Sequence, residues 1–296
     1  MALFRIITPS AALRSGAFAN AALDSECLFG EAFEAEQSEN GFTFGMLASD
    51  GYRGWIPDDC LGELPAPNAR VIAPMSDVTS QADIKGVGRF ALSLGALVTI
   101  TSLHDDRAEI ITPDGTGFLP RQHLLPLASR GAGDTAAGHV LGDVTRVDDW
   151  VAIAEKFVAS PYKWGGRCAW GLDCSALVQL VLAAGGIDAP RDSGPQHYIG
   201  SGIDDLSQLQ RGDLVFWHGH VGIMQDGKTL LHANAHHMAV ASEPLDDAIA
   251  RIAITAGPVT ALRRPVTDWG RSGEINSSRH LAESYGEAAI ASKAME

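Results

Sequence analysis

The chain has 296 residues, 46% of them hydrophobic, and a net charge of −14 at neutral pH. Its length allows two or three domains, and the acidic balance without runs of lysine or arginine excludes nucleic acid as the expected partner. Its four cysteines are too few and too scattered for a disulfide framework, which suits a compartment where thiols stay reduced.

The N-terminal segment holds only a short apolar run, MALF, before Thr8 and Pro9. It lacks the apolar h-region of a secretory signal, so we expect a cytoplasmic protein. The longest apolar stretch, residues 176–186, falls short of the ~18 residues of a membrane span, and no membrane contact is expected. The sequence gives no indication of oligomeric state.

Residues 1–67 alternate short apolar runs with turn residues. Asp50-Gly51 between two such runs is a hairpin signal, and the pattern predicts a small β domain. Residues 68–128 repeat this pattern, which predicts a second small β domain. The segments GYRGWIPDDCLGEL and GTGFLPRQHLLPL resemble diverged copies of one closing segment. A repeat of this kind favours two tandem small barrels over a sandwich.

Small and polar residues over 129–145 predict a linker. A helix is then expected, with Asp148 as N-cap and Pro161 as its stop. The predicted catalytic domain covers residues 146–265. Beyond it, residues 266–296 are polar and rich in Ala and Ser, and we interpret them as a tail with one possible helix.

The segment 161–181, PYKWGGRCAWGLDCSALVQLV, places Cys174 after a Gly-rich turn at the start of an apolar helix. The free N–H groups of a first helical turn favour a thiolate, which suits a nucleophile. The alternative is a buried core cysteine, because Cys174 shares an apolar stripe with Leu177 and Val178. His220 and His232, on two later strand-like runs, favour a thiol hydrolase.

A zinc site is the rival explanation for the histidines. His218 and His220 lie two apart on a predicted strand, and His232, His236 and His237 follow. No HExxH helix supports this interpretation, and it leaves Cys174 unexplained. We therefore expect no metal and no other cofactor. His218 would replace His220 as the base if the strand register were shifted by two.

Six ordered blocks carry a family resemblance. The chain resembles the NlpC/P60 cysteine peptidases at Trp164–Gly166, Asp173–Ser175, Pro190–Ser193, Gly212–Phe216, His220–Ile223 and His232–Ala233. One departure is Ala176, where the family usually has glycine, and alanine is the better helix former. The N-terminal barrels resemble bacterial SH3-like domains. The fold implied is α+β, with a papain-like NlpC/P60 domain after two small SH3-like β-barrels.

The resemblance implies a mechanism that the residues can perform. Cys174 would attack the scissile carbonyl, and His220 would take the thiol proton to form a thiolate–imidazolium pair. His232 would orient the His220 ring. The backbone N–H of Cys174 would stabilise the oxyanion.

The resemblance also implies a substrate. NlpC/P60 chains with N-terminal SH3-like domains resemble γ-D-glutamyl-L-diamino acid peptidases, which release L-Ala-D-Glu from murein peptides with a free amino terminus. The expected function is cleavage of the γ-D-Glu to diamino-acid bond in short peptides during cell-wall recycling. The sequence leaves open whether the third residue is diaminopimelate or lysine.

Substrate-binding positions follow from the same match. Asp192 and Tyr52 would bind the ammonium, with Glu31 as a second acid, while Ser193 and Ser175 would contact the D-Glu carboxylate. Asp173 is expected to be an N-cap that could also position substrate. Trp164 would form a wall of the groove, and Arg191 would bind a substrate carboxylate or pair with Asp188 or Asp192.

Each position has a structural alternative. Asp192 could cap a turn, Tyr52 could be a solvent-facing strand residue, Glu31 a surface acid and Trp164 packed core. The alternative functions are an inactive or acyl-transferring relative, and an endopeptidase that acts on intact wall.

Overall fold

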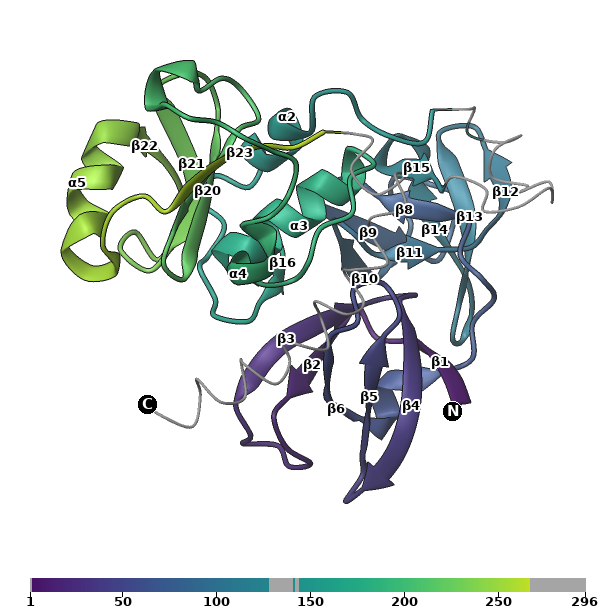
Figure 1. Ribbon diagram of the computed structural model, residues 1–296. Coiled ribbons are helices and arrows are strands. Elements are labelled where there is room, and N and C mark those ends of the chain that lie inside the picture. Colours follow the sequence, from purple (N-terminus) through teal and green to yellow (C-terminus); the bar gives the residue numbers. More distant parts are fainter. Residues whose placement is uncertain (1, 128–140, 142–143, 267–296) are drawn as a thin grey trace.

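The computed structural model describes residues 2–127, 141 and 144–266 of the chain. These residues fall into three groups of elements that lie side by side (Figure 1): two β units and a mixed α+β unit. Apart from residues 141, 144, 145 and 266, the predicted linker at 129–145 and the predicted tail at 266–296 lie outside the described residues.

The first unit is a seven-stranded antiparallel sheet with the order β3-β2-β6-β5-β4-β1-β7. Its inward-facing side chains, among them Ile6, Leu13 and Phe33, form one small core. The elements are β1 (Ala2–Ile6), β2 (Ser10–Arg14), β3 (Leu23–Leu28), β4 (Ala32–Glu39), β5 (Phe42–Leu47), β6 (Arg53–Pro57), the 3₁₀ turn η1 (Asp58–Cys60) and β7 (Leu61–Gly62).

The second unit has a five-stranded sheet, β10-β9-β14-β13-β12, and a three-stranded sheet, β11-β8-β15. Its elements are β8 (Ala69–Val71), β9 (Met75–Thr79), β10 (Gly88–Ser93), β11 (Leu97–Val98), β12 (Ile100–His104), β13 (Arg107–Thr112), β14 (Gly115–Pro120), η2 (Arg121–His123) and β15 (Leu124–Pro126). Both units close in the same way: a strand ends at a proline, a 3₁₀ turn follows, and a short strand completes the unit.

The third unit contains a six-stranded sheet with the order β18-β23-β19-β20-β21-β22 and a two-stranded ribbon, β16-β17. Its elements are α2 (Trp150–Glu155), β16 (Arg167–Cys168), β17 (Gly171–Leu172), α3 (Cys174–Ala184), α4 (Ser193–Gln196), β18 (Ser201–Gly202), η3 (Leu206–Gln208), β19 (Leu214–Trp217), β20 (His220–Met224), β21 (Thr229–Asn234), β22 (Ala239–Pro244), α5 (Leu245–Ala256) and β23 (Ala261–Arg264).

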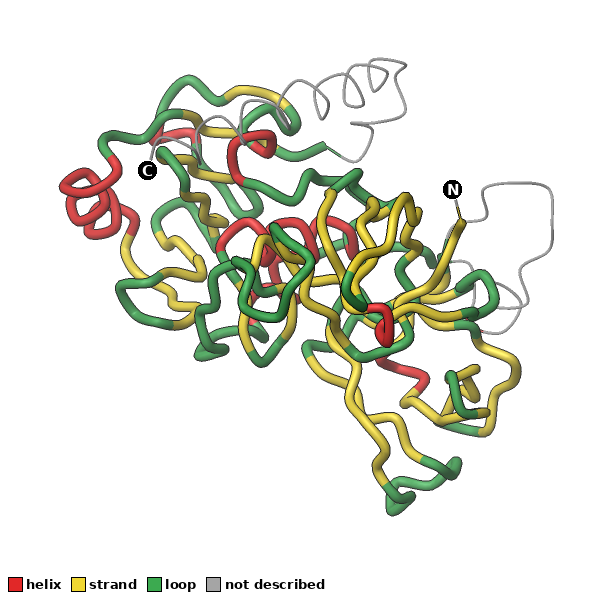
Figure 2. Tube along the Cα trace, turned by 90° about the horizontal axis from the view of Figure 1, so that it is seen from below, coloured by secondary structure: helices red, strands yellow, loops and turns green. Residues whose placement is uncertain are grey.

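Helices cover both faces of this sheet (Figure 1). Alternate residues of β19 show why the strand is apolar throughout: Leu214 and Phe216 pack in the core with α3, while Val215 and Trp217 pack in the core with α5. A strand buried on both faces needs a continuous apolar run, and the sequence LVFW supplies it. Figure 2, from below, shows most helical segments in this part of the molecule.

The first helix of the third unit differs from the prediction. It spans Trp150–Glu155, and its N-cap is Asp149, whose Oδ1 accepts a hydrogen bond from the N–H of Ala152 at 3.2 Å. The predicted N-cap, Asp148, lies one residue too early. The helix ends at Glu155, well before Pro161, and the turn that follows contains Ala159 with a φ of 71°.

The corner between β3 and β4 joins all three units. Leu28 belongs to the core around α3, and the next residue, Phe29, belongs to the core of the second β unit. Gly30 follows with a φ of +76°, and a Cβ there would lie 1.9 Å from the carbonyl oxygen of Leu97. Only glycine permits this approach, so the corner fixes the first unit against the other two.

Buried charges cross the same interface. The guanidinium of Arg167 makes a two-pronged contact with Glu31, at 3.0 and 3.1 Å, and donates to the carbonyl oxygen of Glu26 at 2.8 Å. The Glu26 carboxylate accepts from the Arg167 N–H at 2.9 Å and is also paired with Lys163. Buried ions are tolerated only when paired, so these contacts specify one docking geometry.

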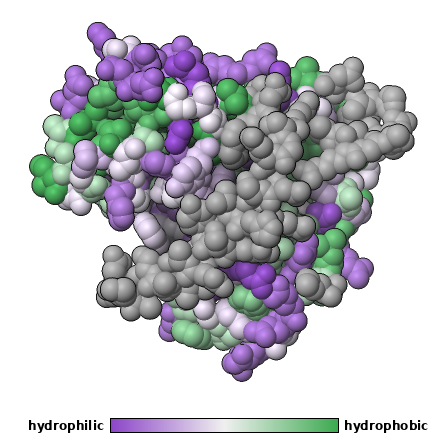
Figure 3. All heavy atoms as spheres, viewed as in Figure 1, coloured by the Kyte–Doolittle hydropathy of each residue, from purple (hydrophilic) through white to green (hydrophobic). Residues whose placement is uncertain are grey.

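Polar residues cover much of the face shown in Figure 3 outside the grey atoms. Within the ranges that the structure describes, no helix has both the length and the apolarity to cross a bilayer.

Candidate active site

Cys174 is the first residue of α3. Asp173 caps this helix: its Oδ1 accepts the Ala176 N–H at 2.8 Å. The Cys174 N–H is therefore a first-turn amide without an intrahelical acceptor, in the position required for an oxyanion donor. Ala176, which replaces the expected glycine, is fully buried in this turn.

The Asp173 carboxylate is saturated by the protein itself. It also accepts from the Gly165 N–H at 3.0 Å and from both terminal nitrogens of Arg191, at 3.0 and 2.7 Å. This gives Asp173 a structural role in place of the expected substrate contact. Arg191 is likewise buried, with its Nε donating to Ser25 at 2.8 Å, so its partner is Asp173 and not Asp188 or a free substrate carboxylate.

The Cys174 sulfur meets the sheet where β20 and β21 separate. These two strands pair only at Ile223 and Met224, so they diverge toward His220. The backbone N–H of Val221 interacts with the sulfur and lowers the pKa of the thiol, against a larger opposing effect of burial. The sulfur thus lies beside the residue that follows His220. Between the sulfur and the His220 ring, both within the described residues, there is no hydrogen bond.

The two predicted histidines contact each other directly. His220 Nε2 lies 2.7 Å from His232 Nδ1. The nitrogen of His220 that remains for the thiol proton is therefore Nδ1. His218 lies in the exposed two-residue turn between Trp217 and His220, which pair in register. The shifted register that would have made His218 the base is therefore wrong.

Burial dominates the protonation of this site. It raises the pKa of Cys174 to about 12, with Asp173 adding to the shift. It also lowers the pKa of His220 to about 3, with His232 and Arg251 acting in the same direction. Both shifts favour a neutral thiol and a neutral imidazole over the thiolate–imidazolium pair expected from the sequence, because desolvation outweighs the effect of the first-turn amides.

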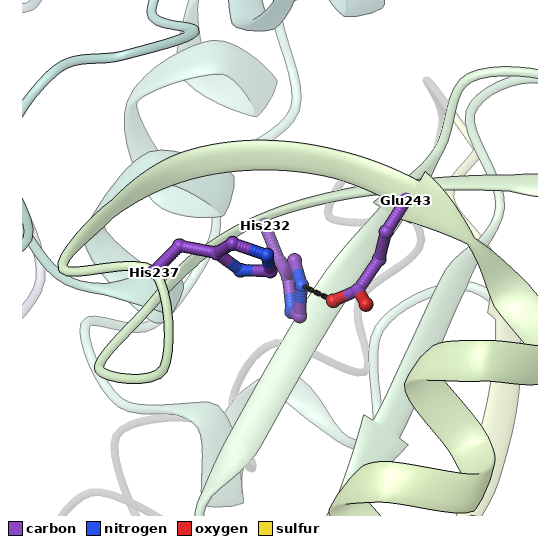
Figure 4. Close-up of side chains that lie close together, drawn as sticks. All are labelled: His232, His237 and Glu243. Atoms are coloured by element: carbon purple, nitrogen blue, oxygen red, sulfur yellow. Dashed lines mark hydrogen bonds and ion pairs between the residues drawn. The ribbon is translucent and has the colours of Figure 1, made fainter.

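The second ring nitrogen of His232 also has a hydrogen-bond partner. Its Nε2 lies 2.7 Å from Oε1 of Glu243, and Figure 4 shows these two side chains with His237 beside them. Donor atoms of His232, His237 and Glu243 lie within 4.8 Å of one another. Both ring nitrogens of His232 already have partners, however, and Arg251 is paired with Glu243. A cation would have to displace these contacts.

Tyr162 is a site residue that the sequence analysis missed. Burial raises the pKa of its hydroxyl to about 12, with Cys174 and Asp173 as the next causes, and its side chain packs against the core cluster that contains Cys174. Its backbone is fixed by a hydrogen bond from its N–H to the Met238 carbonyl at 3.0 Å. Its position directly before the Trp164–Gly166 turn was the available signal.

Tyr52 reaches the catalytic unit from the first β unit. Burial raises the pKa of its hydroxyl, and the Asp192 carboxylate is the next cause in the same direction, so the two groups interact across the interface. Asp24 of β3 raises it further and was also missed. Asp192 itself is exposed and stands at the N-cap position of α4. The charges of Asp192 and Asp24 therefore both act on the Tyr52 hydroxyl.

Glu31 does not join Tyr52 and Asp192. Its carboxylate is buried, accepts the Leu28 N–H at 2.7 Å and is paired with Arg167. We correct its assignment: it is an interface residue and has no free oxygen directed at substrate.

The remaining predicted residues differ in exposure. Ser175 is buried, and its hydroxyl accepts from Arg191 at 3.0 Å and donates to Asp173 at 3.2 Å. Ser193 begins α4 and is partly exposed. Trp164 is 68% exposed, so it is not packed core.

The fold and this site define a class: an α+β protein with a papain-like thiol site behind small β units. Its sequence matches the model of the NlpC/P60 family over residues 159–253 and that of the bacterial dipeptidyl-peptidase SH3 domain over residues 13–61. The chain therefore carries a domain of the NlpC/P60 cysteine peptidase family behind an SH3-like β domain. The predicted family and fold class are confirmed.

Curated relatives bear peptidase names. Gamma-D-glutamyl-L-lysine dipeptidyl-peptidase of Bacillus subtilis is 30% identical over 132 residues, which cover 37% of this chain and 44% of the relative. Dipeptidyl-peptidase 6 of Lysinibacillus sphaericus is 29% identical over 133 residues, covering 44% and 45%. This chain thus matches less than half the length of either relative.

The fold similarity extends further. The crystal structure of an NlpC/P60 family protein from Bacillus cereus superposes with a TM-score of 0.71 at 20% identity, over 89% of this chain and 99% of the other. At this identity the likeness concerns the fold, including the β units that precede the catalytic unit.

Proposed function

We propose that this protein is a cysteine peptidase that hydrolyses the γ-D-Glu to diamino-acid bond of short murein peptides with a free N-terminal L-Ala, in cell-wall recycling. Cys174 attacks the γ-carbonyl of D-Glu while its proton passes to Nδ1 of His220. The imidazolium then protonates the leaving amine, and water hydrolyses the thioester. The Cys174 N–H and the Tyr162 hydroxyl face the developing oxyanion.

The observation that carries this proposal is the hydrogen-bonded docking of the Tyr52 hairpin on α3 through Asp50 and Gln179, with the Tyr52 hydroxyl under the influence of the Asp192 charge. It brings a residue of the first β unit to the catalytic unit, together with Asp24, and so offers carboxylates and a hydroxyl for an ammonium group. An ammonium buried at a closed end of a groove requires such partners. These groups favour a free peptide end over an internal bond of intact wall.

The name of the Bacillus subtilis relative specifies lysine after the γ-D-glutamyl group, so we propose L-Ala-γ-D-Glu-L-Lys as the first substrate to test. The diaminopimelate analogue serves as the alternative.

The experiment compares each peptide with its N-acetylated form. We expect release of L-Ala-D-Glu from the free peptide, a loss of at least about 100-fold on acetylation because a desolvated charge pair is lost, and no effect of a chelator. Asp192→Asn should weaken cleavage of the free peptide, while Asp204→Asn, an exposed acid on another surface, should not. Equal cleavage of free and acetylated peptides would overturn the proposed specificity.

A further inference from the structure

The strongest unexplained feature of the site is the carboxylate behind His232. Glu243 lies on β22 and pairs in register with Leu230, so it stands diagonally across from His232 of β21, on the same face of the sheet. Its Oε1 lies 2.7 Å from His232 Nε2. Arg251, one turn and a half into α5, is paired with the same oxygen.

We propose that Glu243 is a positioning residue that sets the tautomer of the base, two hydrogen bonds away from it. This inference rests on the proposed function for its role in catalysis. A carboxylate can only accept, so the proton of the neutral His232 ring must stand on Nε2. His232 Nδ1 is then bare and must accept, so the proton of His220 stands on Nε2. That leaves Nδ1 of His220 bare to receive the thiol proton of Cys174.

The opposite arrangement would disable the site. If the His232 proton stood on Nδ1, it would donate to His220 Nε2 and drive the His220 proton onto Nδ1. The one His220 nitrogen left for the thiol proton would then have no lone pair. A histidine base held in the wrong tautomer is known to cost up to about 10⁴-fold in rate.

The surroundings of His220 and His232 support a proton on Nε2 of each ring. His232 is 1% exposed, so water does not compete for its ring nitrogens. Burial and then Arg251 lower the pKa of His232 to about 3, so the ring is neutral and can accept at one nitrogen while it donates at the other. When His220 becomes an imidazolium, the Glu243 charge lies at the far end of the hydrogen-bond chain and stabilises it without taking a proton.

The experiment uses the full chain and two substitutions of the same residue. Glu243→Gln keeps an acceptor oxygen, whereas Glu243→Leu removes it. We expect a loss in kcat of about 10-fold for Gln and about 100-fold for Leu, with KM nearly unchanged. His237→Ala is the matched control, because His237 belongs to the same cluster but hydrogen-bonds to Asn234, and it should keep wild-type activity.

A second readout separates orientation from packing and does not depend on cleavage. In protein labelled with ¹⁵N-histidine, the ring ¹⁵N shifts of His220 and His232 should show both protons on Nε2 in the wild type and in Glu243→Gln. Glu243→Leu should show mixed tautomers at both rings while remaining folded. If the wild type cleaves no murein peptide but these shifts change as expected, the proposed function fails and the tautomer assignment stands. Unchanged tautomers in a folded Glu243→Leu variant, or equal losses in both variants, would overturn the assignment.

Discussion

The side-chain amide of Gln179 donates to Asp50 at 2.9 Å and so joins the catalytic helix to the first β unit. Asp50 also accepts the N–H of Tyr52 at 3.0 Å. One carboxylate therefore fixes the hairpin that carries Tyr52 onto the helix that carries Cys174. The proposed binding of the substrate ammonium near Tyr52 depends on this contact, although neither Gln179 nor Asp50 has a role in the proposed chemistry.

Gln179→Met should raise KM for the free-amine peptide by about 10-fold with little change in kcat, because the substitution releases the Tyr52 hairpin without altering Cys174. Steady-state kinetics with free and acetylated peptides measures this. The control is Gln81→Met, at an exposed glutamine of the second β unit. A loss confined to kcat would show that Asp50 and Gln179 act on the chemistry instead.

Arg167→Met should destabilise the protein by about 3–5 kcal/mol, because it leaves the buried carboxylate of Glu31 without its cation. Urea unfolding followed by fluorescence gives the change. Adding Glu31→Gln to this variant should recover part of the loss, since the remaining group is then neutral. A change below about 1 kcal/mol would mean that the ion pair does not hold the units together.

Tyr162→Phe should lower kcat by about 100-fold and leave KM and the melting temperature nearly unchanged, because only the hydroxyl proposed to donate to the oxyanion is lost. The raised pKa of Tyr162, about 12, keeps that donor protonated at working pH. Tyr198→Phe, at a tyrosine that is 52% exposed, is the control and should behave as the wild type. A wild-type kcat for Tyr162→Phe would place the oxyanion elsewhere.

The raised pKa of Cys174 and the lowered pKa of His220 predict the pH dependence of alkylation. The resting thiol is protonated, so iodoacetamide should react slowly at pH 6 to 8, and the rate should rise about tenfold per pH unit above that range, toward the pKa. His220→Ala should change the rate little. A plateau between pH 5 and 8 that His220→Ala removes would show a resting ion pair.

Local patterns made part of this site predictable. The Gly-rich turn, the Asp173 cap and the apolar helix are all adjacent in sequence, so the place of Cys174 follows from them. The apolar runs around His220 and His232 likewise predict neighbouring strands. The strand register was harder to predict from the sequence. The same apolar runs allowed His218 as the base, and only the pairing of Trp217 with His220 decides between His218 and His220.

Long-range partners were not predictable. Arg167 and Glu31 are 136 residues apart, and nothing local indicates that they meet. The same holds for Asp24 near Tyr52 and for Glu243 behind His232, whose roles depend on docking and on register. The charge state of Cys174 depends on burial, which a helix-terminus argument leaves out.

Trapping of the acyl-enzyme tests the central claim most directly. The full chain is mixed with L-Ala-γ-D-Glu-L-Lys, quenched in acid within the first turnovers, digested and analysed by mass spectrometry. We expect an L-Ala-D-Glu group joined as a thioester to the peptide that contains Cys174, absent with the N-acetylated substrate and in Cys174→Ala. Product release with the adduct on another residue, or cleavage that persists in Cys174→Ala, would contradict the account.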